Sequence, residues 1–372
     1  MRFLHVADLH LGRKLNDISL LEDQRDILKQ IVLICQFKNI DAILICGDIY
    51  NNSTPTPETM TLFNDFINEL VKNKVKAYII AGNHDSDQRV AYFSSIAKNV
   101  GIYISEEFDG KIEHYTLEDE FGKVNIHLLP FIKPIYVKKF YPEEKIKTYE
   151  DAMKVVLKHN PINKNERNIL LAHQFITGAE HTDVETLSVG GLDNIDAKVF
   201  DDYDYVALGH IHKAQRVGRD TLRYSGSIMK YSFSEENHKK SVTLVEIKNK
   251  GEITYELIPL VFKHELRTIK GNFNDLMNMP YSEDYVRIIL TNDDVEPDAR
   301  VSLLTVFPNM VKFSIQNNKT NFEHNVISED ITNKNIVELF KDFYALQNND
   351  CELDEEHLKV LEDTIKEMED RN

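Results

Sequence analysis

Five short polar motifs in this 372-residue sequence combine carboxylate, imidazole and amide side chains in a way that suits metal binding. The motifs are Asp8-Leu9-His10, Gly47-Asp48, Gly82-Asn83-His84-Asp85, His173 and Gly209-His210-Ile211-His212. Each follows an apolar run, so each is expected at the end of a buried strand. Mixed oxygen and nitrogen donors of this kind suit divalent ions such as Mn²⁺, Fe²⁺ or Zn²⁺. The motifs therefore predict a centre for divalent metal ions.

Seven residues of these motifs are the predicted metal ligands, and they form two sets. Residues i and i+2 of an extended segment point to the same side, so the Asp-x-His and His-x-His motifs could each place two donors in one cavity. Asp48 is expected to bridge two ions roughly 3.5–4 Å apart. The first set is Asp8, His10, Asp48 and His212, and the second is Asp48, Asn83, His173 and His210. Two ions held in this way would activate a water molecule for attack on phosphorus.

His84 lies next to a predicted ligand in the sequence, but we predict that it works without binding the metal ions. A protonated imidazole there could stabilise developing negative charge or protonate the leaving oxygen. Asp85 is expected to orient His84 and to raise its pKa. The predicted catalytic residues are therefore His84 and Asp85.

Each motif alone has a simpler explanation. An Asp-x-His or Gly-Asp at a strand end is usually a turn or an incidental sequence. Five such motifs in order, each after an apolar run, argue against that explanation for the whole set.

The first third of the sequence predicts alternating strands and helices that would position these motifs. Strands are predicted at 3–7, 42–46 and 77–81, and apolar residues recur at helical spacing between them. Thr56 and Pro57 suit the N-cap and first turn of the second helix. This is the pattern of βαβ units, in which the carboxyl edge of the sheet normally carries the site.

The middle of the sequence predicts a second sheet packed on the first. Its expected strands are 124–129, 169–172, 205–208, 242–247 and 253–257. A small βαβαβ unit is then predicted between 266 and 316. Its strands are expected at 266–269, 286–290 and 311–315, and its helices at 273–277 and 299–307.

We expect three parts in the chain: a main domain at 1–262, a βαβαβ capping domain at 263–318, and a linker with a helical tail at 319–372. Amphipathic helices are predicted in the tail at 336–343 and 358–368. The second is densely acidic on its other face. That face could be simply solvated, or the helices could dock a partner.

The composition is that of an ordinary soluble protein, with 42% hydrophobic and 28% charged residues. The net charge of −17 is unusual for a protein that binds DNA through its own surface. Either the substrate is not nucleic acid, or metal ions and a partner supply the positive charge. We find no apolar run of membrane-spanning length and no signal peptide. The cysteines, Cys35, Cys46 and Cys351, show no paired spacing, which favours the reducing cytoplasm.

The motif order resembles that of the calcineurin-like metallophosphoesterase superfamily, which runs Asp-x-His, Gly-Asp, Gly-Asn-His-Asp/Glu, His, Gly-His-x-His. Within it the chain is similar to the SbcD family, the nuclease subunits of bacterial SbcC–SbcD complexes. The likeness is strong over about 1–260, extends to the small unit, and matches the tail only in character. The segments that carry it are 8–12, 47–50, 82–86, 209–212, 224–227 and 231–235.

This resemblance implies an α/β fold, a two-sheet α/β/β/α sandwich with a small α+β cap and C-terminal helices. It implies two bound Mn²⁺ ions and a double-strand 3′→5′ exonuclease that also cuts single strands and hairpins, in DNA repair, recombination and replication. The implied partners are DNA and an SbcC-type coiled-coil ATPase, with a homodimer inside a heterotetramer and no membrane. Arg13, Lys14 and Arg89 are candidates for phosphate contacts, although they could equally be solvated surface residues.

Two other functions are compatible with the same motifs. A phosphoesterase for a small molecule or a phosphoprotein would use the same metal chemistry, but it would not need the cap or the helical tail. A non-catalytic scaffold would tend to have lost ligands, and every ligand position is present.

Overall fold

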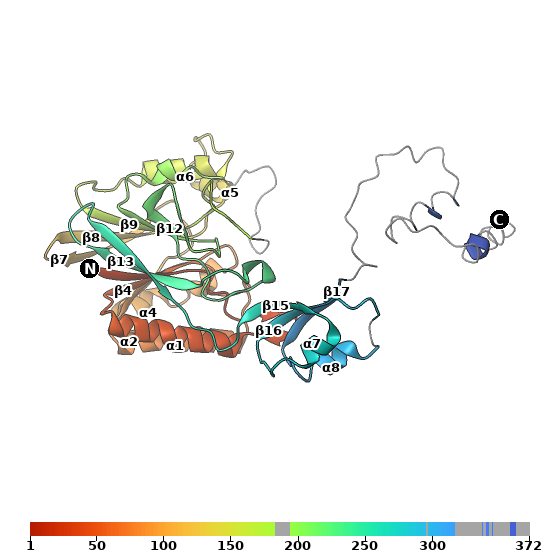
Figure 1. Cartoon of the computed structure of the whole chain (residues 1–372). Helices are drawn as coiled ribbons and strands as arrows, with labels where there is room; N and C mark the ends of the chain where they lie inside the picture. The colour runs from red at the N-terminus through yellow and green to blue at the C-terminus, as the bar shows by residue number, and fades with distance from the viewer. Residues whose placement is uncertain are drawn as a thin grey trace. The chain divides into compact units, whose positions relative to one another are not determined.

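The computed structural model of the chain describes residues 1–182, 194–294 and 297–316, together with 337, 340, 341, 344 and 358–361. Contacts divide the chain into two compact units, Met1–Glu265 and Leu266–Asn372 (Figure 1). Most of each predicted tail helix, at 336–343 and 358–368, lies outside the described residues. Among the described helices, none is both long enough and apolar enough to cross a membrane.

The first sheet of the larger unit has six strands in the order β14-β13-β1-β4-β5-β6. β1 (Arg2–Val6), β4 (Ala42–Cys46), β5 (Lys76–Ile80) and β6 (Ile102–Ile104) run parallel to one another. Every residue of β4 is buried, as expected of a central strand covered on both faces. The predicted βαβ architecture of the first third is confirmed.

Two long helices connect these strands and cover the outer face of the first sheet (Figure 1). α1 (Leu21–Phe37) turns an apolar face that includes Ile27 and Ile31 toward the core. α2 (Pro57–Lys72) begins after Thr56, whose side chain accepts a hydrogen bond from the Thr59 amide. The helix start therefore follows from the N-cap residue and the proline in the first turn.

The second sheet also has six strands, in the order β11-β12-β10-β9-β8-β7. They are β7 (Glu113–Asp119), β8 (Gly122–Leu128), β9 (Arg167–His173), β10 (Tyr205–Gly209), β11 (Gln215–Val217) and β12 (Arg219–Tyr224). β8, β9, β10 and β12 are parallel, and β7 and β11 are antiparallel edge strands. The three strands predicted at 124–129, 169–172 and 205–208 form its centre.

The strands predicted at 242–247 and 253–257 are present, but their expected place in the second sheet is wrong. β13 (Ser241–Ile247) pairs antiparallel with β1, and β14 (Ile253–Pro259) pairs antiparallel with β13. Both therefore belong to the first sheet. β1 would otherwise be an edge strand with unpaired backbone groups, and the returning chain supplies their partners.

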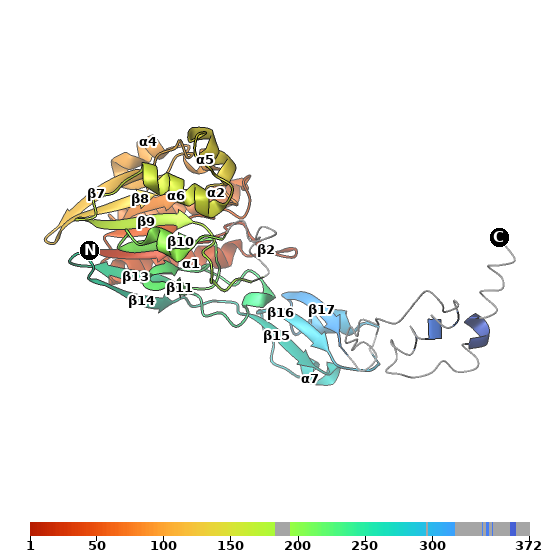
Figure 2. The ribbon, with the colours of Figure 1, turned by 90° about the horizontal axis from the view of Figure 1, so that it is seen from above.

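The two sheets pack face to face, which gives four layers of the order α/β/β/α (Figures 1 and 2). The core between the sheets includes Leu44 and Tyr78 from the first sheet, and Ile126 and Ile169 from the second. A second core lies between the second sheet and two helices, α5 (Pro134–Phe140) and α6 (Tyr149–His159). The predicted two-sheet sandwich is confirmed.

Several short elements complete the larger unit. They are β2 (Lys14–Leu15), β3 (Ile18–Ser19), α3 (Asp87–Val90), α4 (Ser94–Ala97) and the 3₁₀ turns η1 (Lys98–Val100), η2 (Ala197–Phe200) and η3 (Phe233–Glu235).

The second unit contains a parallel three-stranded sheet in the order β15-β16-β17. Its elements are β15 (Leu266–Gly271), α7 (Phe273–Met277), β16 (Tyr285–Leu290), α8 (Ala299–Leu303) and β17 (Met310–Ile315). α8 ends at Leu303 rather than at 307, and Phe307 is nevertheless fully buried. The unit has its own apolar core, which includes Leu276, Val286 and Phe307.

Candidate metal centre

All seven predicted ligands lie just beyond the carboxyl ends of strands from the two sheets. β1, β4 and β5 lead to Asp8, Asp48 and Asn83, while β9 ends on His173 and β10 ends one residue before His210. The four histidines and the two aspartates are buried, at 8% exposure or less, and Asn83 is partly exposed. The sandwich thus brings together residues that are up to 204 positions apart in the sequence.

The loops that carry these residues turn sharply at the ligands themselves. Asp8, His10, Asp48 and His210 have positive backbone φ angles of 52°, 41°, 51° and 100°. Such conformations cost of order 1–3 kcal/mol each in residues other than glycine, and they cluster at functional sites. The predicted reason for Asp8 and His10 to share a side, an extended segment, is wrong. The two side chains meet the same site because the backbone bends at each of them.

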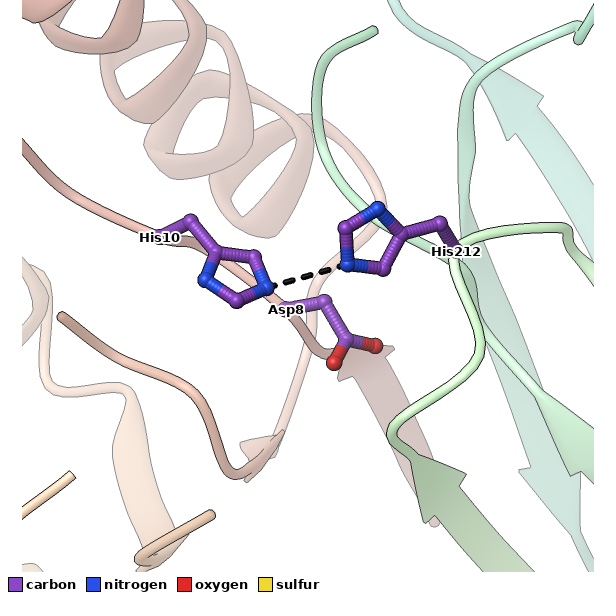
Figure 3. A group of neighbouring side chains, drawn as sticks. All are labelled: Asp8, His10 and His212. Atoms are coloured by element: carbon purple, nitrogen blue, oxygen red, sulfur yellow. Dashed lines mark hydrogen bonds between the residues drawn. The ribbon is translucent and has the colours of Figure 1, made fainter. Parts of the chain in front are cut away.

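Asp8, His10 and His212 form one group of converging donors (Figure 3). Their ligand atoms lie within 4.8 Å of one another. The Nε2 atoms of His10 and His212 are 3.0 Å apart, and Asp48 Oδ2 is 3.6 Å from His10 Nε2. One cation could therefore contact donors from both sheets at this position.

A second group of donors surrounds the other side of Asp48. The ligand atoms of Asp8, Asp48 and His173 again lie within 4.8 Å of one another, and Asp48 Oδ2 is 3.3 Å from His173 Nε2. Asn83 Oδ1 is 3.0 Å from His173 Nε2 and 2.9 Å from His210 Nδ1. Asp48 Oδ2 lies near both groups, as a bridging carboxylate would. Asp8 also belongs to both groups, whereas the prediction from the sequence assigned it to the first ion only.

Hydrogen bonds on the far side of the rings turn the ligand nitrogens toward the site. His173 Nδ1 donates to Cys46 O over 2.8 Å, since a carbonyl oxygen can only accept. His212 Nδ1 lies 3.0 Å from a carboxylate oxygen of Glu235. Both arrangements leave Nε2 with a lone pair for a metal ion. The donor set and its orientation fit a pair of divalent cations.

Glycine is required before Asn83 and His210 because chain segments approach each other closely there. A Cβ atom at Gly209 would overlap the Cys46 carbonyl and lie 2.6 Å from His173 Nδ1. A Cβ atom at Gly82 would overlap the carboxylate and amide of Asp48. These two glycines let the strand ends of the two sheets meet around the centre.

Burial and mutual charge strongly affect the protonation of the ligands. Burial raises the pKa of Asp8 to about 6 and holds the pKa of His10 well below its ordinary value. Burial alone would raise the pKa of Asp48, but the hydrogen bond from His173 and the charges of His173, His10 and His84 together bring that pKa well below its usual range. Burial would also lower the pKa of His173, but the Asp48 carboxylate raises it to about 9. Cations entering this centre would therefore have to displace protons.

The structure gives Asp85 different partners from those predicted. Its carboxylate oxygens accept hydrogen bonds from the backbone amides of Ile49, Tyr50 and Gly82, at 3.0, 2.9 and 2.9 Å. Asp85 therefore ties the loop after Asp48 to the loop before Asn83. It does not orient His84, because its lone pairs are directed at these backbone amides.

His84 lies at the border of the first group of donors. Its backbone amide donates to Asp48 Oδ1 over 2.9 Å, and its ring stands edge-on to His10 with centroids 5.0 Å apart. Its Nδ1 lies 3.3 Å from Asn51 O. That carbonyl, rather than Asp85, fixes the orientation of the ring and leaves Nε2 for another contact.

Sequence reasoning missed the residues that support the ligands from behind. Gln24 donates to His10 O over 2.8 Å and accepts from the Gly12 amide over 2.9 Å. Tyr231 donates its hydroxyl to Leu9 O. Glu235 contacts His212, 23 residues earlier in the chain. Tyr231 and Glu235 lie in the segment 231–235 that carries the family resemblance, but neither the resemblance nor any spacing rule assigned them, or Gln24, to the support of the ligands.

Two family models match parts of this chain. The calcineurin-like phosphoesterase family model matches residues 1–214, and the model for the type 5 capsule protein repressor C-terminal domain matches residues 263–348. The chain is similar to the SbcD component of the nuclease SbcCD from Staphylococcus epidermidis, with 31% identity over 99% of this chain and 98% of the relative. The corresponding SbcD protein from Staphylococcus saprophyticus is 30% identical over 91% of this chain and 92% of the relative. A dimetal phosphatase structure from Danio rerio matches with 11% identity and a TM-score of 0.41, over 70% of this chain and 96% of its own.

Proposed function

The chain belongs to the calcineurin-like phosphoesterase family and, within it, to the SbcD family, and on that premise we propose that it is the DNA nuclease subunit of an SbcC–SbcD-type repair complex. The convergence of seven donor residues from two sheets on one buried centre carries the proposal. The match of residues 263–348 to a second domain model supports the nuclease over a phosphatase, because a small-substrate enzyme would not need that unit.

Asp8, His10, Asp48 and His212 would hold one metal ion, and Asp48, Asn83, His173 and His210 the other. When bound, two divalent ions supply positive charge that polarises the phosphoryl group and activates the attacking water. We propose Mn²⁺ for both positions, as the family resemblance implies; the combination of hard oxygens with imidazole nitrogens is compatible with this ion. His84, which borders the centre without belonging to either donor group, stabilises the developing charge or protonates the leaving oxygen.

The proposed substrate is DNA, which is degraded 3′→5′ from duplex ends and cut within single strands and hairpins. Two of the candidate cations support this proposal by their position. Arg13 donates to the Asn51 side chain over 3.0 Å, and Arg89 donates to Ser53 O over 2.9 Å. Both guanidinium groups thus flank the loop that follows Asp48, where a phosphodiester would enter. Lys14, on the exposed end of β2, is the third candidate.

We further propose that the chain acts as a homodimer within a heterotetramer. Tyr92, Phe93, Ile96 and Val100 are between 55% and 76% exposed on consecutive turns of α4 and its flanks, and such an apolar surface supports a contact with a second copy. Residues 263–318 would form the cap, and the tail at 319–372 would dock the coiled-coil ATPase. Cys35 and Cys46 are free, buried thiols, in keeping with a cytoplasmic location.

The proposed substrate class can be tested by direct competition between substrates. The protein with Mn²⁺ is expected to release nucleotides from linear duplex DNA far faster than it hydrolyses cyclic nucleotides or phosphopeptides. The measurement is product formation per unit time on each substrate at equal enzyme concentration, with EDTA as the metal-free control. Hydrolysis of the small substrates or the phosphopeptides without any release of nucleotides would assign the chain to the alternative, a phosphoesterase of another substrate class.

A further inference from the structure

Three histidines of the centre differ in what their outer ring nitrogen contacts. His173 Nδ1 donates to the neutral carbonyl of Cys46 over 2.8 Å. His212 Nδ1 faces a carboxylate oxygen of Glu235 at 3.0 Å. His10 Nδ1 is buried and has no hydrogen-bond partner among the described residues. The outer ring nitrogen thus faces a neutral acceptor in His173, a charged acceptor in His212 and no acceptor in His10 among the described residues.

The carboxylate behind His212 is part of a buried ion pair. Glu235 is 0% exposed and Lys240 is 4% exposed, and the Lys240 ammonium contacts Glu235 Oε2 directly. The same ammonium donates to His212 O over 2.9 Å and to Ser227 Oγ over 2.7 Å. Lys240 therefore holds both the carboxylate and the backbone of the histidine that the carboxylate contacts.

Stability alone does not explain this pair. Removing two charges from water costs several kcal/mol each, and well-packed apolar residues of similar size often stabilise a protein as well or better. The effect of Glu235 on the His212 ring explains why this buried pair is charged. A carboxylate that accepts the Nδ1 proton fixes the tautomer and the ring direction, and it makes Nε2 a stronger donor toward a metal ion. Lys240 pairs with the buried carboxylate, offsets its charge and holds it against His212.

We propose that Glu235, held in place by Lys240, is a positioning residue that makes His212 a stronger imidazole donor than His10 or His173. Its carboxylate then strengthens cation binding at the position that includes His10 and His212, and not at the position that includes Asn83 and His173. This inference rests on the proposed two-metal centre, and it adds a supporting residue that acts on only one of the two ions.

Calorimetric titration of the metal-free, full-length protein with Mn²⁺ tests the inference without any catalytic readout. The wild type is expected to show two binding steps. Glu235→Gln keeps an acceptor oxygen near His212 Nδ1 but removes the charge, so one binding step should weaken by about 10–100-fold while the other is unchanged. Because Glu235→Gln leaves the Lys240 ammonium buried without its carboxylate, the double variant Glu235→Gln/Lys240→Met is titrated as well. It removes both charges together and should show the same selective loss.

The matched control is Glu256→Gln, which removes the carboxylate of an exposed pair with Lys38 (3.0 Å) on the same unit and should leave both steps as in the wild type. The inference is overturned if the folded double variant, checked by thermal melting, binds like the wild type. It is also overturned if both steps weaken equally, because Glu235 would then support the fold in general. A wild-type protein that binds fewer than two ions would instead contradict the proposed two-metal centre itself.

Discussion

The variant His84→Ala is expected to lose turnover on duplex DNA by about 10²–10⁴-fold, the usual contribution of a general acid–base residue, while both metal positions still fill. His84 belongs to neither group of converging donors, so removing its imidazole takes no ligand away. Its backbone amide, which donates to Asp48 Oδ1 over 2.9 Å, remains in the alanine variant. The bridging carboxylate therefore keeps its position.

Steady-state digestion of labelled duplex DNA measures the loss, and metal analysis of the same sample measures the Mn²⁺ content. His159→Ala is the matched control, because His159 lies on α6 and contacts Glu144 at 3.0 Å, away from the centre. It should keep full turnover. If the His84 variant loses its metal ions together with its activity, the assignment of His84 as a residue that works without binding metal is wrong.

The variant Asp48→Asn is expected to lose both metal binding and turnover. Asp48 Oδ2 lies 3.6 Å from His10 Nε2 and 3.3 Å from His173 Nε2, so its charge serves both donor groups. A bound metal supplies several kcal/mol of transition-state stabilisation, and about 1.4 kcal/mol corresponds to a tenfold change in rate. Turnover should therefore fall by roughly 10³-fold or more, and Mn²⁺ titration should show both binding steps weakened.

Asp26→Asn provides the control for this substitution. Asp26 lies on α1 and pairs with Lys29 over 3.0 Å at the exposed surface, so the same chemical change there should alter neither binding nor turnover. An Asp48→Asn protein that keeps one binding step at wild-type affinity would show that Asp48 serves a single ion. An Asp48→Asn protein with unchanged function would favour the non-catalytic scaffold.

Much of the fold and of the donor set could be predicted because both depend on local sequence. Strands such as β4 are uninterrupted apolar runs, and the N-cap at Thr56 and the proline that follows it specify the start of α2. The motifs follow directly after those strands, so their convergence followed from the rule that parallel strands place their carboxyl ends at one edge. The placement of β13 in the first sheet was missed because strand partners depend on contacts distant in sequence.

The predictions about the metal centre that proved wrong failed for the same reason: they depend on contacts between residues far apart in the sequence. The left-handed backbone of Asp8 and His10 gives only a weak signal in residue type, since positive φ is expected mainly of glycine, although Asp and His adopt it more often than most other residues. Asp85 next to His84 suggested a pair, but a loop 35 residues away offered its carboxylate backbone amides instead. Glu235 reaches His212 only because the chain folds back after β12. Tertiary contacts that join distant loops decided each of these cases.

The two-metal centre itself is tested most directly by crystals of the protein soaked in Mn²⁺ and measured at the manganese absorption edge. We expect two anomalous peaks roughly 3.5–4 Å apart, with Asp48 in contact with both, one peak beside His10 and His212, and the other beside Asn83 and His173. A single peak at full occupancy, or peaks away from these residues, would contradict it.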